Sequence, residues 1–242
     1  MRSSDRFLVR ESAARLYGNG QRIWDPKDRW NAYKRSIISG FAQRYAQLSI
    51  EHAETILDAG CGCEPYPWIP KRAISFDRFT RQLRNRPNPI AGDLERLPFE
   101  KQSIDFVICV ASVLNYVSAA ESVAEMSRVL RPGGRILLHY ETSTSFEHIF
   151  SGRWGDSAVR INTINNGRED TLWIYSPSYV DALLANEGLR VSKRHSFHIG
   201  SALALRLGFS QERSSRLAIF DGFLRALRPF GDDMIILAEK LA

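Results

Sequence analysis

The chain has 242 residues, of which 44% are hydrophobic and 25% are charged, with 16 glycines and 10 prolines. This is the composition of an ordinary folded protein, and it excludes a disordered, collagen-like or coiled-coil chain. The net charge of +6 arises from 33 basic and 27 acidic residues spread along the chain, so charge alone does not indicate a nucleic-acid partner.

The sequence contains neither a membrane span nor a recognisable leader. No apolar run reaches the roughly 18 to 20 residues that cross a bilayer. Charged residues between Arg2 and Arg10 occupy the place where a signal peptide has its apolar stretch. The three cysteines are an odd number in a chain too long to be a disulfide miniprotein. We therefore expect a soluble, unprocessed protein in a reducing cytoplasm.

Residues 1–50 are predicted to form an N-terminal helical cap. A loop-like stretch covers residues 18–26, and apolar side chains then recur at spacings of three or four from Trp30 to Leu48. This period is typical of a helix with one buried face.

From Thr55 onward, short apolar runs alternate with helical segments, which predicts a parallel sheet built from crossover units. The expected strands are 55–59, 73–76, 106–111, 135–140, 189–197 and 234–239.

Two helices in this region carry clear end signals. A helix over 119–130 is closed by Arg131-Pro132-Gly133-Gly134, because proline cannot continue a helix and glycine permits the turn that follows. Ser176-Pro177 is typical of a helix start, and Gly188 of its C-terminal end.

Two insertions interrupt the alternation, at 142–175 and 199–231. The first is polar with interspersed aromatic residues, and the second is apolar and basic with a helical stripe from Leu217 to Leu227. Insertions on a rigid scaffold usually carry specificity. The basic stripe either packs on the sheet or makes a peripheral contact with an anionic membrane.

The most informative motif is Asp58-Ala59-Gly60-Cys61-Gly62, which follows the first expected strand. Closely spaced glycines let a ligand approach the backbone, and the carboxyl ends of parallel strands form the crevice of an open sheet. Asp77 ends the second strand, where a carboxylate can accept hydrogen bonds from both hydroxyls of a ribose.

Together with Gly92-Asp93-Leu94 and the segment 127–134, this motif resembles the class I S-adenosylmethionine-dependent methyltransferases, in particular the group that acts on small molecules. The resemblance covers residues 55–141. It implies a Rossmann-like α/β domain over 51–242, with a mostly parallel sheet, helices on both faces and an antiparallel last strand. Together with the position of each residue in the chain, it gives a set of expected S-adenosylmethionine contacts: Asp58, Gly60, Cys61, Gly62, Asp77, Arg78, Asp93, Leu94, Ala111, Asn115 and Tyr33.

The sequence departs from the family where Glu64 replaces the third glycine and three prolines follow. The first crossover helix is therefore expected to be very short or replaced by a turn. We hypothesise that Trp30, Tyr33 or Arg35 of the N-terminal cap covers the cofactor instead.

The implied function is methyl transfer from S-adenosylmethionine to a small acceptor with an oxygen, nitrogen or carbon nucleophile. His139, Glu141 and Tyr175 are the residues we would test as a general base, because of their location; His148 is a further histidine at the mouth of the expected crevice. Tyr116 is interpreted equally as a core residue or as a ligand contact.

Two alternatives remain. The first is a non-catalytic subunit that binds S-adenosylmethionine or S-adenosylhomocysteine and regulates or scaffolds a partner. The second is a nicotinamide-dependent oxidoreductase, which would need a glycine where Pro65 stands.

No metal and no nucleic acid are expected as partners. The pair Cys61-x-Cys63 lacks the second pair of ligands that a zinc site needs. The segment Val110-Ala111-Ser112 is not the motif with which many nucleobase methyltransferases hold an exocyclic amine, and no added nucleic-acid module is recognisable.

Overall fold

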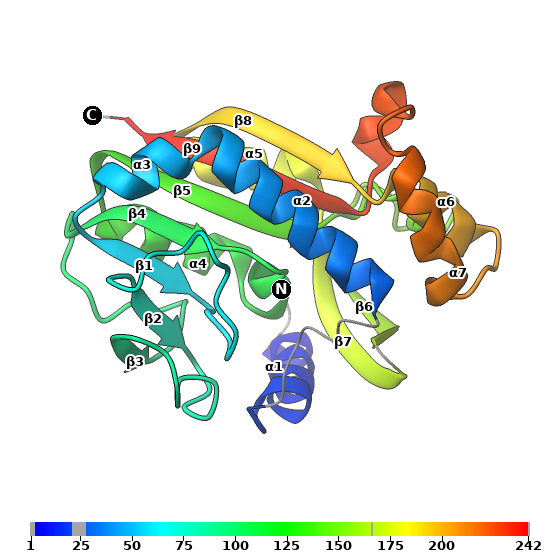
Figure 1. Ribbon diagram of the computed structural model, residues 1–242. Coiled ribbons are helices and arrows are strands. Elements are labelled where there is room, and N and C mark those ends of the chain that lie inside the picture. The colour runs from blue at the N-terminus through cyan, green and yellow to red at the C-terminus, as the bar shows by residue number, and fades with distance from the viewer. Residues whose placement is uncertain (1–2, 21–27, 166, 242) are drawn as a thin grey trace.

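The computed structural model describes residues 3–20, 28–165 and 167–241, which form an α/β domain around a seven-stranded sheet (Figure 1). The strand order is β3-β2-β1-β4-β5-β9-β8; the first five strands are parallel, and β9 is antiparallel to both of its neighbours. The predicted fold class is therefore confirmed. The strands are β1 (Ile56–Ala59), β2 (Ile74–Asp77), β3 (Pro89–Ala91), β4 (Ile104–Cys109), β5 (Leu130–Glu141), β8 (Leu189–Phe197) and β9 (Asp233–Lys240).

Helices cover both faces of the sheet (Figure 1). Because successive side chains of a strand point to opposite faces, Ile56 and Phe106 pack with α2 (Arg29–Tyr45) and α3 (Gln47–His52). Their neighbours Leu57 and Val107 pack on the other face with α4 (Ala119–Val129) and α5 (Pro177–Asn186). Two apolar layers thus hold the sheet.

The connection from β1 to β2 lacks its usual helix. Residues 60–73, all of them described, form turns only. The prediction from Pro65, Pro67 and Pro70 is confirmed, since proline at these positions prevents a regular helix.

The predicted helix ends are also confirmed. α4 ends at Val129 and β5 begins at once, with Gly133 at a φ of 77° where the pairing with β4 is interrupted. At α5, the Ser176 hydroxyl accepts a hydrogen bond from the Tyr179 amide, and Gly188 follows the helix at a φ of 71°.

The N-terminal cap consists of two separate parts. α2 lies on the sheet, whereas α1 (Ser3–Tyr17) packs against a hairpin made of β6 (Ala158–Asn165) and β7 (Arg168–Tyr175) (Figure 1). The Ser12 hydroxyl donates to Asp170 Oδ1 at 3.0 Å and accepts from the Thr171 amide at 2.9 Å. Of the loop expected at 18–26, residues 21–26 lie outside the described residues.

The second insertion is broken into short pieces, so the continuous helical stripe predicted over 217–227 is wrong. It contains α6 (Ile199–Arg206), α7 (Gln211–Ser215) and the 3-10 segments η3 (Arg216–Phe220) and η4 (Arg225–Phe230). Asp221 interrupts the stripe because its carboxylate caps the start of α6, accepting from the Ile199 and Gly200 amides. No helix among the described residues is long and apolar enough to cross a membrane.

Candidate functional site

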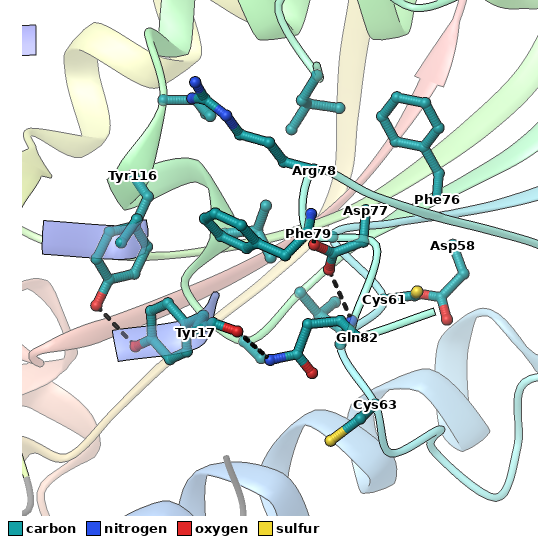
Figure 2. Close-up of a pocket in the computed structure, with 18 of the residues that line it drawn as sticks. Tyr17, Asp58, Cys61, Cys63, Phe76, Asp77, Arg78, Phe79, Gln82 and Tyr116 are labelled. Atoms are coloured by element: carbon teal, nitrogen blue, oxygen red, sulfur yellow. Dashed lines mark hydrogen bonds between the residues drawn. The ribbon is translucent and has the colours of Figure 1, made fainter. Parts of the chain in front are cut away.

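A cavity lies at the carboxyl ends of the strands, next to the point where the strand order reverses between β1 and β4. Open α/β sheets bind ligands at this point. We call it the sheet-end cavity; Figure 2 shows its wall. Its lining comes from the segments after β1, β2, β3 and β4 and from α1, and includes Ala13, Tyr17, Asp58, Gly60, Cys61, Gly62, Asp77, Arg78, Phe79, Asp93, Leu94, Ala111, Val113 and Tyr116.

Gly60 lines the sheet-end cavity at a position where no larger side chain fits. Its φ is 72°, and a Cβ built on it would lie 2.4 Å from Cγ2 of Val113. Its amide donates to the Phe76 carbonyl oxygen at 2.8 Å, which fixes the turn at the end of β1. Only glycine satisfies both constraints without strain.

The Asp77 carboxylate faces the sheet-end cavity with part of its hydrogen-bonding capacity used (Figure 2). Oδ2 accepts from the Gly62 amide at 3.0 Å, and Oδ1 accepts from the Phe79 amide at 2.9 Å. Burial raises the pKa of Asp77, and these two amides oppose that rise. Since a carboxylate oxygen has two lone pairs, each oxygen can still accept one hydrogen bond from a ligand.

Asp58 lines the cavity but is held by a partner that the sequence did not indicate. Its carboxylate forms a buried ion pair with Arg86, which follows β2 by nine positions in the chain. Burial raises the pKa of Asp58, and the guanidinium lowers it. The ion pair ties the loop after β1 to the segment after β2.

The predicted adenine-side residues also reach the sheet-end cavity. Asp93 Oδ1 accepts from the Glu95 amide at 3.1 Å, and Oδ2 lies 3.2 Å from Nη2 of Arg10. Leu94 is buried beside it. Arg10 belongs to α1, so this helix contacts the site that it partly covers.

Two residues expected to contact the cofactor, Asn115 and Tyr33, line neither this cavity nor its neighbour. The Asn115 side-chain amide donates to the Trp173 carbonyl oxygen at 2.5 Å and accepts from the Glu141 amide at 3.0 Å. The Tyr33 hydroxyl donates to Asp221 at 3.2 Å. Both side chains connect segments that are distant in the sequence. The expectation that they line the cofactor cavity is therefore corrected.

The N-terminal cap lines the sheet-end cavity through α1 and not through α2. Ala13 and Tyr17 of α1 line the sheet-end cavity. Trp30 lines a second cavity, and Arg35 donates to the Pro65 carbonyl oxygen at 2.8 Å, behind the loop. The buried positions Val9, Ala13 and Leu16 have helical spacing, and this was the signal in the sequence that would have identified α1.

A second, polar cavity adjoins the first and shares Tyr17, Ala111 and Tyr116 with it. We call it the polar cavity. Its ionisable lining comes from α2, from η2 (Phe146–His148) and from the ends of β5, β7 and β9, and consists of Lys34, Glu141, Glu147, His148, Asp170 and Asp232.

Of the three predicted base candidates, only Glu141 lines the polar cavity. Its Oε1 lies 2.9 Å from Nζ of Lys34 and accepts from the Ser112 hydroxyl at 2.9 Å. The Lys34 ammonium also lies 3.0 Å from Asp233, so two carboxylates hold it beside the cavity.

His139 and Tyr175 are buried and do not reach either cavity. The His139 Nδ1 accepts from the Ser112 amide at 3.0 Å, and burial lowers the pKa of the ring. The Tyr175 hydroxyl donates to the Val117 carbonyl oxygen at 2.7 Å, and burial raises its pKa. They were predicted to lie beside the substrate; this is corrected, because both are buried in the fold and hydrogen-bonded to its backbone.

A chain of hydroxyl groups stands where the two cavities meet. The Tyr17 and Tyr116 hydroxyls are 2.9 Å apart (Figure 2), and Tyr116 donates to Asp170 Oδ2 at 2.5 Å. Burial raises the pKa of Tyr116 well above its ordinary value. Tyr116 lines both cavities. The sequence had allowed either a core residue or a ligand contact at this position.

Comparison with known proteins supports the resemblance. The family model of a methyltransferase domain matches residues 57–138. The chain is 41% identical over 143 residues to a demethylmenaquinone methyltransferase of Mycobacterium sp. (strain KMS), covering 58% of this chain and 51% of that protein. It is 32% identical over 135 residues to a malonyl-[acyl-carrier protein] O-methyltransferase of Herminiimonas arsenicoxydans, covering 50% and 52%.

A solved structure of an S-adenosylmethionine-dependent methyltransferase from Listeria monocytogenes superposes with a TM-score of 0.60 at 14% identity, covering 87% of this chain and 100% of that one. This likeness shows the fold. The alignments span about half the length of the curated relatives or less. The matched segment contains the glycine loop, Asp77 and Asp93. Residues 57–138 therefore match a methyltransferase domain, and the chain as a whole has the fold of an S-adenosylmethionine-dependent methyltransferase.

Proposed function

We propose that this chain transfers a methyl group from S-adenosylmethionine, bound in the sheet-end cavity, to a small molecule bound in the polar cavity. The observation that carries this proposal is the junction of the two cavities at Tyr17, Ala111 and Tyr116. A donor and an acceptor that occupied the two cavities would meet there.

The residues of the sheet-end cavity fit this cofactor. Gly60 lines the cavity at a positive φ, and Val113 packs closely on the side where a Cβ would project. Asp77 keeps one acceptor site on each carboxylate oxygen for the two ribose hydroxyls. Phe79 and Leu94 supply apolar surface for the adenine, with the Asp93 carboxylate beside them as acceptor for its amine.

The charges that line the polar cavity indicate the chemical class of the methyl acceptor. Four carboxylates face it and Lys34 is the cation among its described lining residues. Because Lys34 is already paired with Glu141 and Asp233, an acceptor that donates hydrogen bonds, through hydroxyl or amine groups, fits this lining better than an anion does. The similarity to demethylmenaquinone and malonyl-[acyl-carrier protein] methyltransferases supports methyl transfer, without narrowing the acceptor further.

The chemistry needs positioning above all. When bound, S-adenosylmethionine supplies a methyl group that is already electrophilic because it is attached to a sulfonium. The protein has to hold the nucleophile in line with that methyl group and to exclude water. We assign the alignment to Tyr17 and Tyr116 at the junction, and the acceptance of a proton from the nucleophile to a carboxylate oxygen of Glu141.

The test of this function is a screen of small hydroxyl- and amine-containing molecules with methyl-labelled S-adenosylmethionine, with Glu141→Gln as the variant. We expect labelled product with at least one acceptor, and a lower kcat for the variant with its affinity for S-adenosylhomocysteine unchanged. Binding of the cofactor without transfer to any acceptor, together with a second polypeptide that co-purifies, would instead support the regulatory subunit.

Membrane contact and location remain predictions. In the region 199–231, seven large apolar side chains are exposed in a segment that also contains five arginines: Leu203, Leu207, Phe209, Leu217, Ile219, Phe220 and Phe223, with Arg206, Arg213, Arg216, Arg225 and Arg228. Apolar and basic groups together are typical of a peripheral contact with an anionic lipid surface. A cytoplasmic location agrees with three cysteines that form no disulfide among the described residues.

A further inference from the structure

Three side chains that could ligate a metal ion converge in the wall of the polar cavity. Glu147, His148 and Asp232 each place a ligand atom within 4.8 Å of the other two. All three line the polar cavity, and none of them lines the sheet-end cavity. The cluster combines one imidazole nitrogen with two carboxylates.

The backbone holds the two parts of this cluster together, although they are far apart in the sequence. η2 supplies Glu147 and His148, while Asp232 directly precedes β9. The Thr142 amide donates to the Asp232 carbonyl oxygen at 2.7 Å. The ring of Phe146 stacks on Phe230 at 4.7 Å between centroids. These contacts hold η2 beside the segment that precedes β9.

The cluster lacks the partners that such groups normally have. Asp232 is only 6% exposed, and its carboxylate forms no hydrogen bond or ion pair with any described residue. The side chains of Glu147 and His148 likewise form none within the described ranges. Buried carboxylates are otherwise paired with a cation or a donor, because burying them alone is costly.

Most of the charged groups around the cluster are carboxylates. The carboxylates of Asp233, Glu147 and Glu141 lie close enough to Asp232 to repel its negative charge. Lys34, the lysine that lines the polar cavity, is already paired with Glu141 and Asp233. A divalent ion would supply the positive charge that the protein does not.

We propose that Glu147, His148 and Asp232 bind a divalent ion of the first transition series, such as Mn²⁺, Fe²⁺ or Zn²⁺. A set of nitrogen and carboxylate oxygen ligands suits these ions, and three protein ligands leave positions open for water or a substrate. The prediction of no metal rested on the cysteines, which this cluster does not involve.

The ion would also define the acceptor more narrowly. Because all three ligands line the polar cavity, a bound ion would lie at its wall and would hold an acceptor that has an oxygen ligand next to its nucleophile. This role rests on the proposed methyl transfer, whereas binding of the ion does not.

The test is a titration of the chelator-treated, full-length protein with Mn²⁺, followed by the electron paramagnetic resonance signal of the free ion. Mn²⁺ is chosen because it prefers oxygen and nitrogen ligands to thiolates. We expect one site per chain, with affinity reduced about tenfold or more in Glu147→Gln and in Asp232→Asn. Glu54→Gln, an exposed carboxylate before β1, is the matched control and should bind as the wild type does.

Thermal unfolding of the same proteins provides a second readout. Mn²⁺ should raise the Tm of the wild type, because it binds the folded state, and should not raise that of the two variants. Without metal, the variants should be at least as stable as the wild type, since each removes a crowded carboxylate. A parallel titration with S-adenosylhomocysteine should give equal affinity in all four proteins, which separates this proposal from the cofactor site.

A Zn²⁺ titration, with Cys63→Ser as an additional variant, identifies binding at the cysteines. The proposal is overturned if Mn²⁺ and Zn²⁺ do not bind at millimolar concentration, if the variants bind as tightly as the wild type, or if binding is lost only in Cys63→Ser. Metal binding without methyl transfer would leave the site intact and count against the proposed function alone.

Discussion

At the scale of single residues, the predicted residues at strand ends lie around one cavity, and several of the others do not reach it. Asp58, Gly60, Asp77 and Asp93 line the sheet-end cavity as expected, because their places follow directly from the ends of the strands. Asn115, Tyr33, His139 and Tyr175 do not line it. Their hydrogen-bond partners come from segments distant in the chain, and no local pattern reveals such a partner.

Replacing Asp77 should weaken cofactor binding. In Asp77→Asn an amide nitrogen takes the place of one carboxylate oxygen, so a ribose hydroxyl or the Gly62 amide loses its acceptor. A hydrogen bond to a charged group contributes about 1.5–3 kcal/mol, which corresponds to a loss of affinity of about 10- to 100-fold. Calorimetric titration with S-adenosylhomocysteine measures this. Glu169→Gln, an exposed carboxylate on β7, is the control; equal affinity in both variants would refute a role for Asp77.

Replacing Gly60 should destabilise the fold through a single contact. The new Cβ of Gly60→Ala meets Val113, and overpacking of this kind costs about 1–3 kcal/mol. Adding Val113→Ala removes that contact but not the strain of a positive φ, so the double variant should recover only part of the loss. Urea unfolding of the three variants tests this prediction, and full additivity of the two single changes would contradict it.

His139 should make stability depend on pH. Burial lowers its pKa, so between pH 8 and pH 5 the unfolded chain takes up a proton on this ring more readily than the folded one. The stability that the neutral ring contributes is therefore present above its unfolded pKa and lost as the pH falls. The difference in unfolding free energy between wild type and His139→Gln should shrink from pH 8 to pH 5. A constant or growing difference in urea titrations would count against a buried neutral ring.

At the scale of elements, the strong patterns were read correctly and the short or mixed ones were not. β8 was predicted to the residue, and the ends of α4 and α5 followed from Gly133, Ser176 and Gly188. β3 has three residues and an exposed edge, too few for a pattern. The hairpin of β6 and β7 alternates as strands do, but its polar composition favoured a loop. These misses left the walls of the polar cavity unpredicted.

Removal of α1 should affect the cofactor cavity without unfolding the sheet. Deleting residues 1–20 takes away Ala13 and Tyr17 from the cavity wall but leaves α2 in the core. We expect the affinity for S-adenosylhomocysteine to fall about tenfold, or 1.4 kcal/mol, while the far-ultraviolet circular dichroism retains the signal of the sheet. The milder variant Ser12→Ala loses the hydrogen bonds between α1 and the hairpin. Its affinity for S-adenosylhomocysteine should lie between that of the wild type and that of the deletion. Unchanged affinity in the deletion would show that α1 does not cover the cofactor.

At the scale of the whole molecule, many of the exposed apolar side chains belong to residues 199–231. The exposed apolar side chains of residues 199–231 lie among arginines, and such a surface binds anionic lipid through apolar insertion and charge together. The wild type should co-sediment with vesicles that contain phosphatidylglycerol and not with pure phosphatidylcholine. Ile219→Glu with Phe223→Glu should abolish this, whereas Leu48→Glu, equally exposed on α3, should not. Equal sedimentation of the wild type and of the variant with Ile219→Glu and Phe223→Glu would refute the contact.

The measurement that tests the central claim most directly is a calorimetric titration of the full chain with S-adenosylhomocysteine, with NADH as the comparison ligand. The geometry of the loop after β1 and of Asp77 predicts saturable binding of S-adenosylhomocysteine at one site per chain and none of NADH. Absence of binding by S-adenosylhomocysteine and by S-adenosylmethionine at millimolar concentration, from a protein shown to be folded, would contradict the assignment.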